Sequence, residues 1–64
     1  MYKLLFEFTG DNKQHFIEAK TIEEILSLSV DAFNQNAELI EIQRDGKIFY
    51  KSCEIYRIIG RTYY

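Results

Sequence analysis

Residues 21–36 read TIEEILSLSVDAFNQN, and this stretch decides the fold. Apolar and small side chains recur in it at spacings of three and four, which places them on one face of a helix. Thr21, followed three residues later by Glu24, fits a capping box at the helix start. We predict a helix from about Ile22 to Gln35, ended by Asn36 in a left-handed conformation. Its buried face comprises Ile22, Ile25, Leu26, Ser29, Val30 and Phe33.

The segments on both sides of this helix alternate between apolar and polar residues, which is typical of strands. Before the helix, the strands predicted over Tyr2–Thr9 and Gln14–Ala19 are joined by turn-forming residues at 10–12. After the helix, Ala37–Arg44 and Lys47–Lys51 flank an Asp-Gly pair, which strongly favours a two-residue hairpin turn. The sequence therefore predicts two hairpins joined by a helix.

The expected fold is α+β in the order ββαββ, with a four-stranded antiparallel sheet and one helix packed on one face. We expect one domain spanning residues 1–64, and the strand order does not follow from the pattern. Two interpretations of Ser52–Ile59 remain open: a short C-terminal helix with Ser52 as its N-cap, or continuation of the fourth strand through a bulge. The helical spacing of Cys53, Tyr56 and Ile59, with Gly60 after them, favours the helix. We expect the face under the main helix to carry Tyr2, Leu4, Phe6, Phe8, Ile17, Ile40 and Ile42.

Length and composition limit the classes of protein to which this chain can belong. The chain has 64 residues, a formal net charge of −2 and one cysteine. A domain of about 60 residues buries only about 60% of the surface of its unfolded chain, which leaves little room for an enclosed substrate pocket. No apolar run approaches the roughly 20 residues of a membrane span. The N-terminus has no secretory pattern and Cys53 has no partner within the chain, so we expect a cytoplasmic protein.

Residues with catalytic or metal-binding chemistry are few. His15 and Cys53 are the only candidates for a base and a nucleophile, and nothing in their spacing brings them together. The chain has no pair of Cys or His residues at metal-ligand spacing and no glycine-rich phosphate loop. We therefore predict no catalytic residues, no metal and no cofactor.

The charge is unevenly distributed. Residues 44–64 contain five basic and two acidic residues, whereas residues 1–43 contain three basic and eight acidic ones. The basic segment also carries four tyrosines, and basic residues among aromatics can bind single-stranded nucleic acid. Against this, the pI of about 5.2 and the absence of known RNA-binding motifs argue for a different role. Tyrosine and arginine are also the residues that dominate protein–protein contacts.

A second candidate surface lies on the far side of the sheet. We expect Leu5, Phe16 and Phe49 to face away from the helix, where they would form an apolar patch of the kind that marks binding sites. The alternatives are that the C-terminal segment covers them or that they are scattered on the surface.

We predict a non-enzymatic protein–protein interaction module, a small regulator or inhibitor of an unidentified protein partner, of the size found in bacteria and phages. The alternative is weak single-stranded nucleic-acid binding through the C-terminal third. We also expect a homodimer, formed by pairing of an edge strand or through the outer aromatic face. The predicted contact residues are Phe16, Phe49, Tyr50, Tyr56, Arg57, Arg61, Tyr63 and Tyr64.

Overall fold

A computed structural model of the chain describes residues 1–10 and 13–60. The elements in chain order are β1 (Tyr2–Phe8), β2 (Gln14–Ala19), α1 (Ile22–Asn34), β3 (Ala37–Arg44), β4 (Lys47–Lys51) and α2 (Ser52–Ile59). The predicted α+β fold is confirmed, and the segment with two open interpretations is a helix. No helix in this part of the chain is long and apolar enough to cross a membrane.

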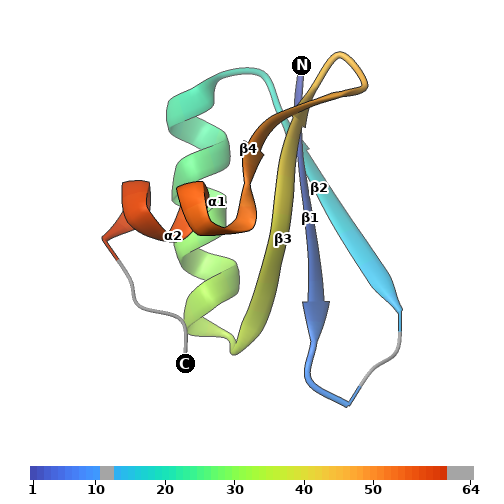
Figure 1. The fold of residues 1–64 in the computed structure, drawn as a ribbon, viewed down its shortest axis with the longest axis vertical. Coiled ribbons are helices and arrows are strands. Elements are labelled where there is room, and N and C mark those ends of the chain that lie inside the picture. Colours follow the sequence, from blue (N-terminus) through green and yellow to red (C-terminus); the bar gives the residue numbers. More distant parts are fainter. Residues whose placement is uncertain (11–12, 61–64) are drawn as a thin grey trace.

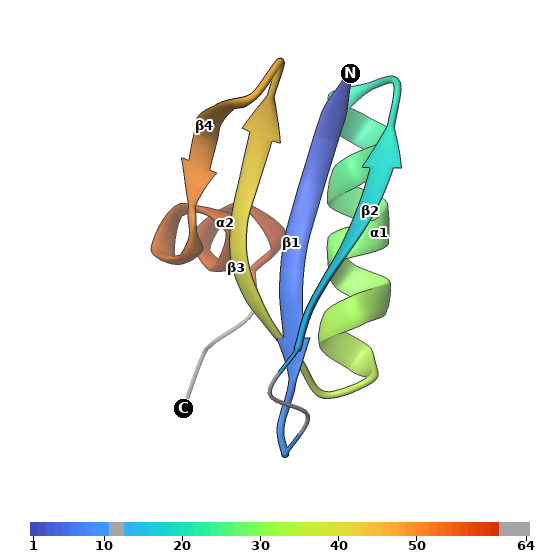
Figure 2. The same ribbon diagram turned by 90° about the vertical axis from the view of Figure 1, so that its right-hand side faces the viewer.

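The four strands form one antiparallel sheet in the order β2-β1-β3-β4. The first strand of the chain thus lies in the middle, and β2 and β4 form the two edges. Both helices lie on the same side of the sheet, and none of the described elements covers its other face (Figures 1 and 2). α1 packs against β1, β2 and β3, whereas α2 packs against β3, β4 and α1. We call the uncovered side the open face.

The core lies between the sheet and the two helices. Its fully buried side chains come from every layer: Leu4, Leu39 and Ile42 from the sheet, and Ile25 and Ile55 from the helices. The expected helix start is present, because the Thr21 hydroxyl oxygen accepts a hydrogen bond from the backbone N–H of Glu24 at 3.2 Å.

A bulge in β3 corrects the predicted core face of this strand. Glu41 lies opposite Leu5 on β1, and Leu39 lies opposite the next β1 residue, Phe6. Ile40 is therefore the extra residue of the bulge, and alternation is interrupted there. We expected Ile40 in the core and Leu39 outside. Instead Leu39 is 1% exposed and Ile40 is only partly buried.

β4 also contains a bulge, and its extra residue is Phe49, because both neighbours of Phe49 pair with residues of β3. We expected this side chain to face away from the helix. Its ring lies edge-on to that of Tyr2, with 5.4 Å between the centroids, and Tyr2 packs against the core. The bulge therefore turns Phe49 to the helix side and removes it from the predicted outer patch.

The chain reverses at residues with a positive φ. Asp45 (φ 51°) and Gly46 (φ 82°) form the predicted hairpin turn between β3 and β4. Asn36 (φ 67°) follows α1, as the sequence indicated. α2 differs from the expectation in its first residues, because Lys51 rather than Ser52 is the N-cap. The Glu54 carboxylate accepts the Lys51 backbone N–H at 2.9 Å.

Candidate interaction surfaces

The sheet order separates the predicted contact residues. Phe16 lies on edge strand β2 and is 58% exposed, whereas Phe49 and Tyr50 lie on the opposite edge strand, β4. Arg57 is exposed on α2. The structure thus offers two surfaces at opposite edges of the sheet. Three further predicted contact residues lie outside the described residues: Arg61, Tyr63 and Tyr64.

Tyr56 belongs to the core and not to a contact surface. Its side chain is 6% exposed, and its hydroxyl oxygen accepts a hydrogen bond from the backbone N–H of Leu39 at 2.9 Å. Its ring lies edge-on to that of Phe33, with 5.8 Å between the centroids. The helical period of α2 turns both Ile55 and Tyr56 toward the sheet. We therefore assign Tyr56 to the core and no longer count it among the predicted contact residues.

One surface gathers around the turn between β3 and β4. We define the hairpin surface as Tyr2, Arg44, Lys47, Ile48 and Phe49. The guanidinium carbon of Arg44 lies 5.7 Å from the ring centroid of Tyr2 and 5.9 Å from that of Phe49. These distances are within the range of cation–π attraction. Both rings therefore attract the same guanidinium, although Arg44 is exposed at the surface.

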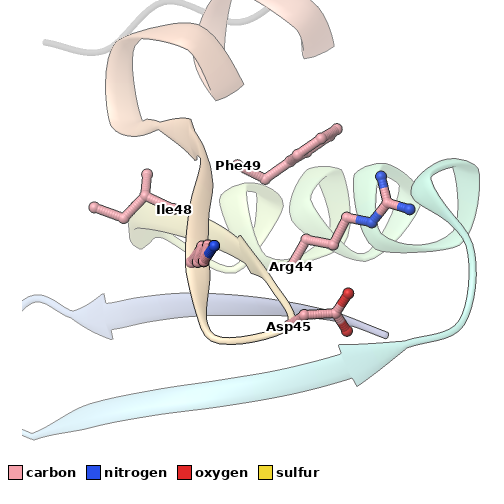
Figure 3. A pocket seen from close by; sticks show the side chains of 5 residues that line it. Arg44, Asp45, Ile48 and Phe49 are labelled. Carbon is pink, nitrogen blue, oxygen red and sulfur yellow. The ribbon is translucent and has the colours of Figure 1, made fainter.

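A shallow depression of about 370 Å³ lies at this hairpin, lined by residues 44, 45 and 47–49 (Figure 3). Arg44 and Phe49 lie on one side of β4, and Ile48 points to the other side (Figure 3). Ile48 is 57% exposed. The depression is open to solvent, so it suits a side chain presented by another molecule better than an enclosed small substrate.

The hairpin surface carries two cations side by side. Arg44 and Lys47 lie directly opposite each other in the register of β3 and β4, an arrangement that is unfavourable for like charges. The nearby Asp45 carboxylate instead contacts the N-terminal ammonium group, 3.4 Å away. Within residues 1–10 and 13–60, neither Arg44 nor Lys47 forms an ion pair with a carboxylate. The surface is therefore suited to an anionic group from another molecule.

Four members of this surface were missing from the predicted contact set: Tyr2, Arg44, Lys47 and Ile48. The sequence did contain a signal for two of them, because the Asp-Gly turn predicts that residues 44 and 47 lie opposite each other. Tyr2 carried no such signal. It joins the surface only because β1 lies next to β3 in the sheet.

The second surface is the β2 edge with the adjoining open face. Phe16 lies opposite Leu5 in the register of β1 and β2, and the ammonium group of Lys3 lies 4.8 Å from the Phe16 ring centroid. Because Phe49 is absent from this face, the apolar patch here is smaller than expected. Phe16 remains its most exposed member.

His15 and Cys53 do not form a catalytic pair. His15 lies on edge strand β2. Its ring stacks on that of Phe6 on β1, with 5.6 Å between the centroids. Cys53 is exposed in the first turn of α2, which follows the opposite edge strand. A nucleophile and its base must lie within hydrogen-bonding distance, and these two residues are separated by the width of the sheet. In the described part of the chain, no three His, Cys, Asp or Glu side chains converge on one point.

Comparison with known proteins identifies no relative of this chain. No protein-family model matches it, and neither a curated protein nor a solved structure does.

Proposed function

We propose that this protein is a non-enzymatic interaction module that regulates or inhibits a partner protein by covering part of its surface. The proposed contact is the hairpin surface. One observation carries the proposal: the Arg44 guanidinium is held over the rings of Tyr2 and Phe49 without an ion-pair partner among the described residues.

The physical chemistry of this cluster suits a protein contact. Arginine and large aromatic residues supply most of the binding energy at protein interfaces. A guanidinium already held by neighbouring rings loses little conformational freedom when it binds a carboxylate. The preferred partner surface carries an Asp or Glu that reaches Arg44 and Lys47, beside an apolar side chain that contacts Ile48 or Phe49.

The same cations would also attract phosphate groups, so nucleic acid is the natural competitor. Base stacking, however, requires open aromatic faces. The Phe49 ring already contacts Tyr2, Tyr50 and Arg44, with 4.7 Å between the centroids of Phe49 and Tyr50. This arrangement favours a protein partner over a single-stranded nucleic acid.

The experiment compares three forms of the tagged full-length chain as baits in lysate of the source cell: wild type, Arg44→Glu and Lys20→Glu. The last is a matched control, because Lys20 is exposed between β2 and α1 and lies outside the hairpin surface. Quantitative mass spectrometry identifies a protein retained by the wild type and Lys20→Glu but lost with Arg44→Glu. That protein is then purified and titrated with each form.

We expect Arg44→Glu to weaken binding of the purified partner by at least about tenfold, a loss of about 1.4 kcal/mol. Equal binding by all three forms would overturn the proposed surface. Binding of a single-stranded oligonucleotide that falls steeply with salt and disappears in Arg44→Glu would support the nucleic-acid function instead.

A further inference from the structure

We propose that two copies of this chain associate through β2, so that their sheets become one continuous sheet with Phe16 at the two-fold axis. This surface lies at the opposite edge from the hairpin surface, so either proposal can fail without the other. The kind of partner is defined by the β2 edge itself: a second, antiparallel copy of the same strand.

The two edges of the sheet differ in their protection against strand pairing. Edge strands are commonly blocked by bulges, lysines or a covering element. β4 has a bulge at Phe49, begins and ends with lysine, and leads directly into α2. β2 has none of these features: its six residues pair with β1 in an uninterrupted register, and no lysine lies within the strand.

The outer edge of β2 is also sterically accessible. Among the elements described, β2 contacts only β1 and α1. Figure 2 shows β2 as the outermost strand of the sheet, with α1 behind it. A second strand can therefore approach in the plane of the sheet.

The alternation of side chains restricts how β2 can pair with its own copy. Directly opposite residues of antiparallel strands point to the same face. Phe16 faces the open side with Leu5, whereas Ile17 lies opposite the fully buried Leu4 on the core side. If the axis passed between Phe16 and Ile17, Phe16 of one copy would lie directly opposite Ile17 of the other. These two side chains point to different faces of the sheet, so they cannot form a directly opposite pair. The two-fold axis must therefore pass through a residue.

Of the central residues, Phe16 gives the best complementarity. With the axis at Phe16, the two phenylalanine rings meet, and Gln14 of each copy lies opposite Glu18 of the other, where amide and carboxylate can hydrogen bond. With the axis at His15, Phe16 would lie opposite Gln14. With the axis at Ile17, Phe16 would lie opposite Glu18. Only the first arrangement buries the 58% exposed Phe16 ring against another apolar side chain.

The available area sets the expected affinity. A standard protein interface buries about 800 Å² per partner, which would be nearly a fifth of the 4496 Å² surface of this chain. The edge of a six-residue strand and one phenylalanine ring provide less than that. We therefore expect a dimer whose population rises with concentration over the micromolar range, and not one that persists at nanomolar concentration.

Sedimentation velocity of the full chain from 1 µM to 1 mM tests the association. Phe16→Glu places two carboxylates together at the two-fold axis of the dimer. Within a single chain, the ammonium group of Lys3 lies close enough to pair with the new carboxylate. Ile58→Glu is the matched control, because Ile58 is also an exposed apolar residue but lies on α2, outside both surfaces. We expect Phe16→Glu to raise the dimer dissociation constant at least about tenfold and Ile58→Glu to leave it unchanged. A wild-type chain that is monomeric at 1 mM overturns the proposal.

Crosslinking tests the register directly, in a Cys53→Ser background that removes the native thiol. With a short thiol crosslinker, Phe16→Cys should link to its own copy rapidly. Gln14→Cys alone should link slowly, because its two copies would lie about 13 Å apart along the strands. A mixture of Gln14→Cys and Glu18→Cys should link as rapidly as Phe16→Cys. Rapid linking of Gln14→Cys to itself, or no linking in the mixture of Gln14→Cys and Glu18→Cys, in which Phe16 is kept, contradicts the proposed register.

Discussion

The backbone N–H of Leu39 donates a hydrogen bond to the hydroxyl oxygen of Tyr56 at 2.9 Å, and this contact joins β3 to α2 inside the core. β4 pairs with β3 only from Glu41 to Arg44, so Leu39 lies beyond the end of β4. Two side chains of α2 replace the missing strand there. The second is Ser52, whose hydroxyl donates to the carbonyl oxygen of Leu39 at 2.8 Å. α2 thus completes the edge of the sheet with side chains.

Tyr56→Phe should lower the free energy of unfolding by about 1–3 kcal/mol, because it leaves the buried N–H of Leu39 without its partner. Urea unfolding followed by circular dichroism measures the change. Tyr50→Phe is the control, since Tyr50 is only partly buried and packs beside Phe49. Equal stability of wild type and Tyr56→Phe would show that the hydrogen bond contributes nothing.

The bulge in β3 predicts opposite outcomes for two adjacent residues. Leu39→Ala should cost about 2–5 kcal/mol, because it opens a cavity at a position that is 1% exposed. Ile40→Ala should cost clearly less, since Ile40 is only partly buried. The same urea titration compares the two variants. A larger loss for Ile40→Ala would mean that β3 presents the other face to the core.

The end of α1 makes a prediction about backbone conformation. Asn36 has a φ of 67°, where a residue with a Cβ atom pays a steric cost of about 1–2 kcal/mol unless its side chain compensates. Asn36→Ala should therefore destabilise the chain by about 1 kcal/mol, whereas Asn36→Gly should be close to neutral. Melting temperatures of the three forms test this order. Equal melting of Asn36→Ala and wild type would argue against the left-handed turn.

The exposed position of Cys53 predicts a thiol that reacts in the folded state. A disulfide reagent should label it rapidly without denaturant. Cys53→Ser should change the free energy of unfolding by no more than about 0.5 kcal/mol, as is usual at surface positions. Labelling that requires urea would mean that α2 buries this side chain.

The strands and helices were predictable because their sequence signals are local. Alternation defined all four strands, and the Asp45-Gly46 pair defined the second hairpin. The two bulges were not predictable, because alternation contains no sign of an inserted residue. Leu39 and Ile40 are adjacent and both apolar, so the sequence alone did not distinguish which of them faces the core.

The candidate site was harder to predict because it depends on which strands are neighbours. The aromatic count of the C-terminal third suggested contact residues, but the Tyr56 side chain is buried between α2 and the sheet. Tyr2, near the N-terminus, joins Arg44 and Phe49 only through the position of β1 beside β3. Composition drew attention to the segment from residue 44 onward, and only the sheet order showed which of its side chains lie together.

We propose the Arg44 guanidinium, which lies over the rings of Tyr2 and Phe49, as the contact point for a partner protein. The most direct measurement is the affinity of the purified partner for the wild-type chain, Arg44→Glu and Lys20→Glu under one buffer condition. We expect binding that is unchanged in Lys20→Glu and at least about tenfold weaker in Arg44→Glu. The same affinity for all three forms would contradict it.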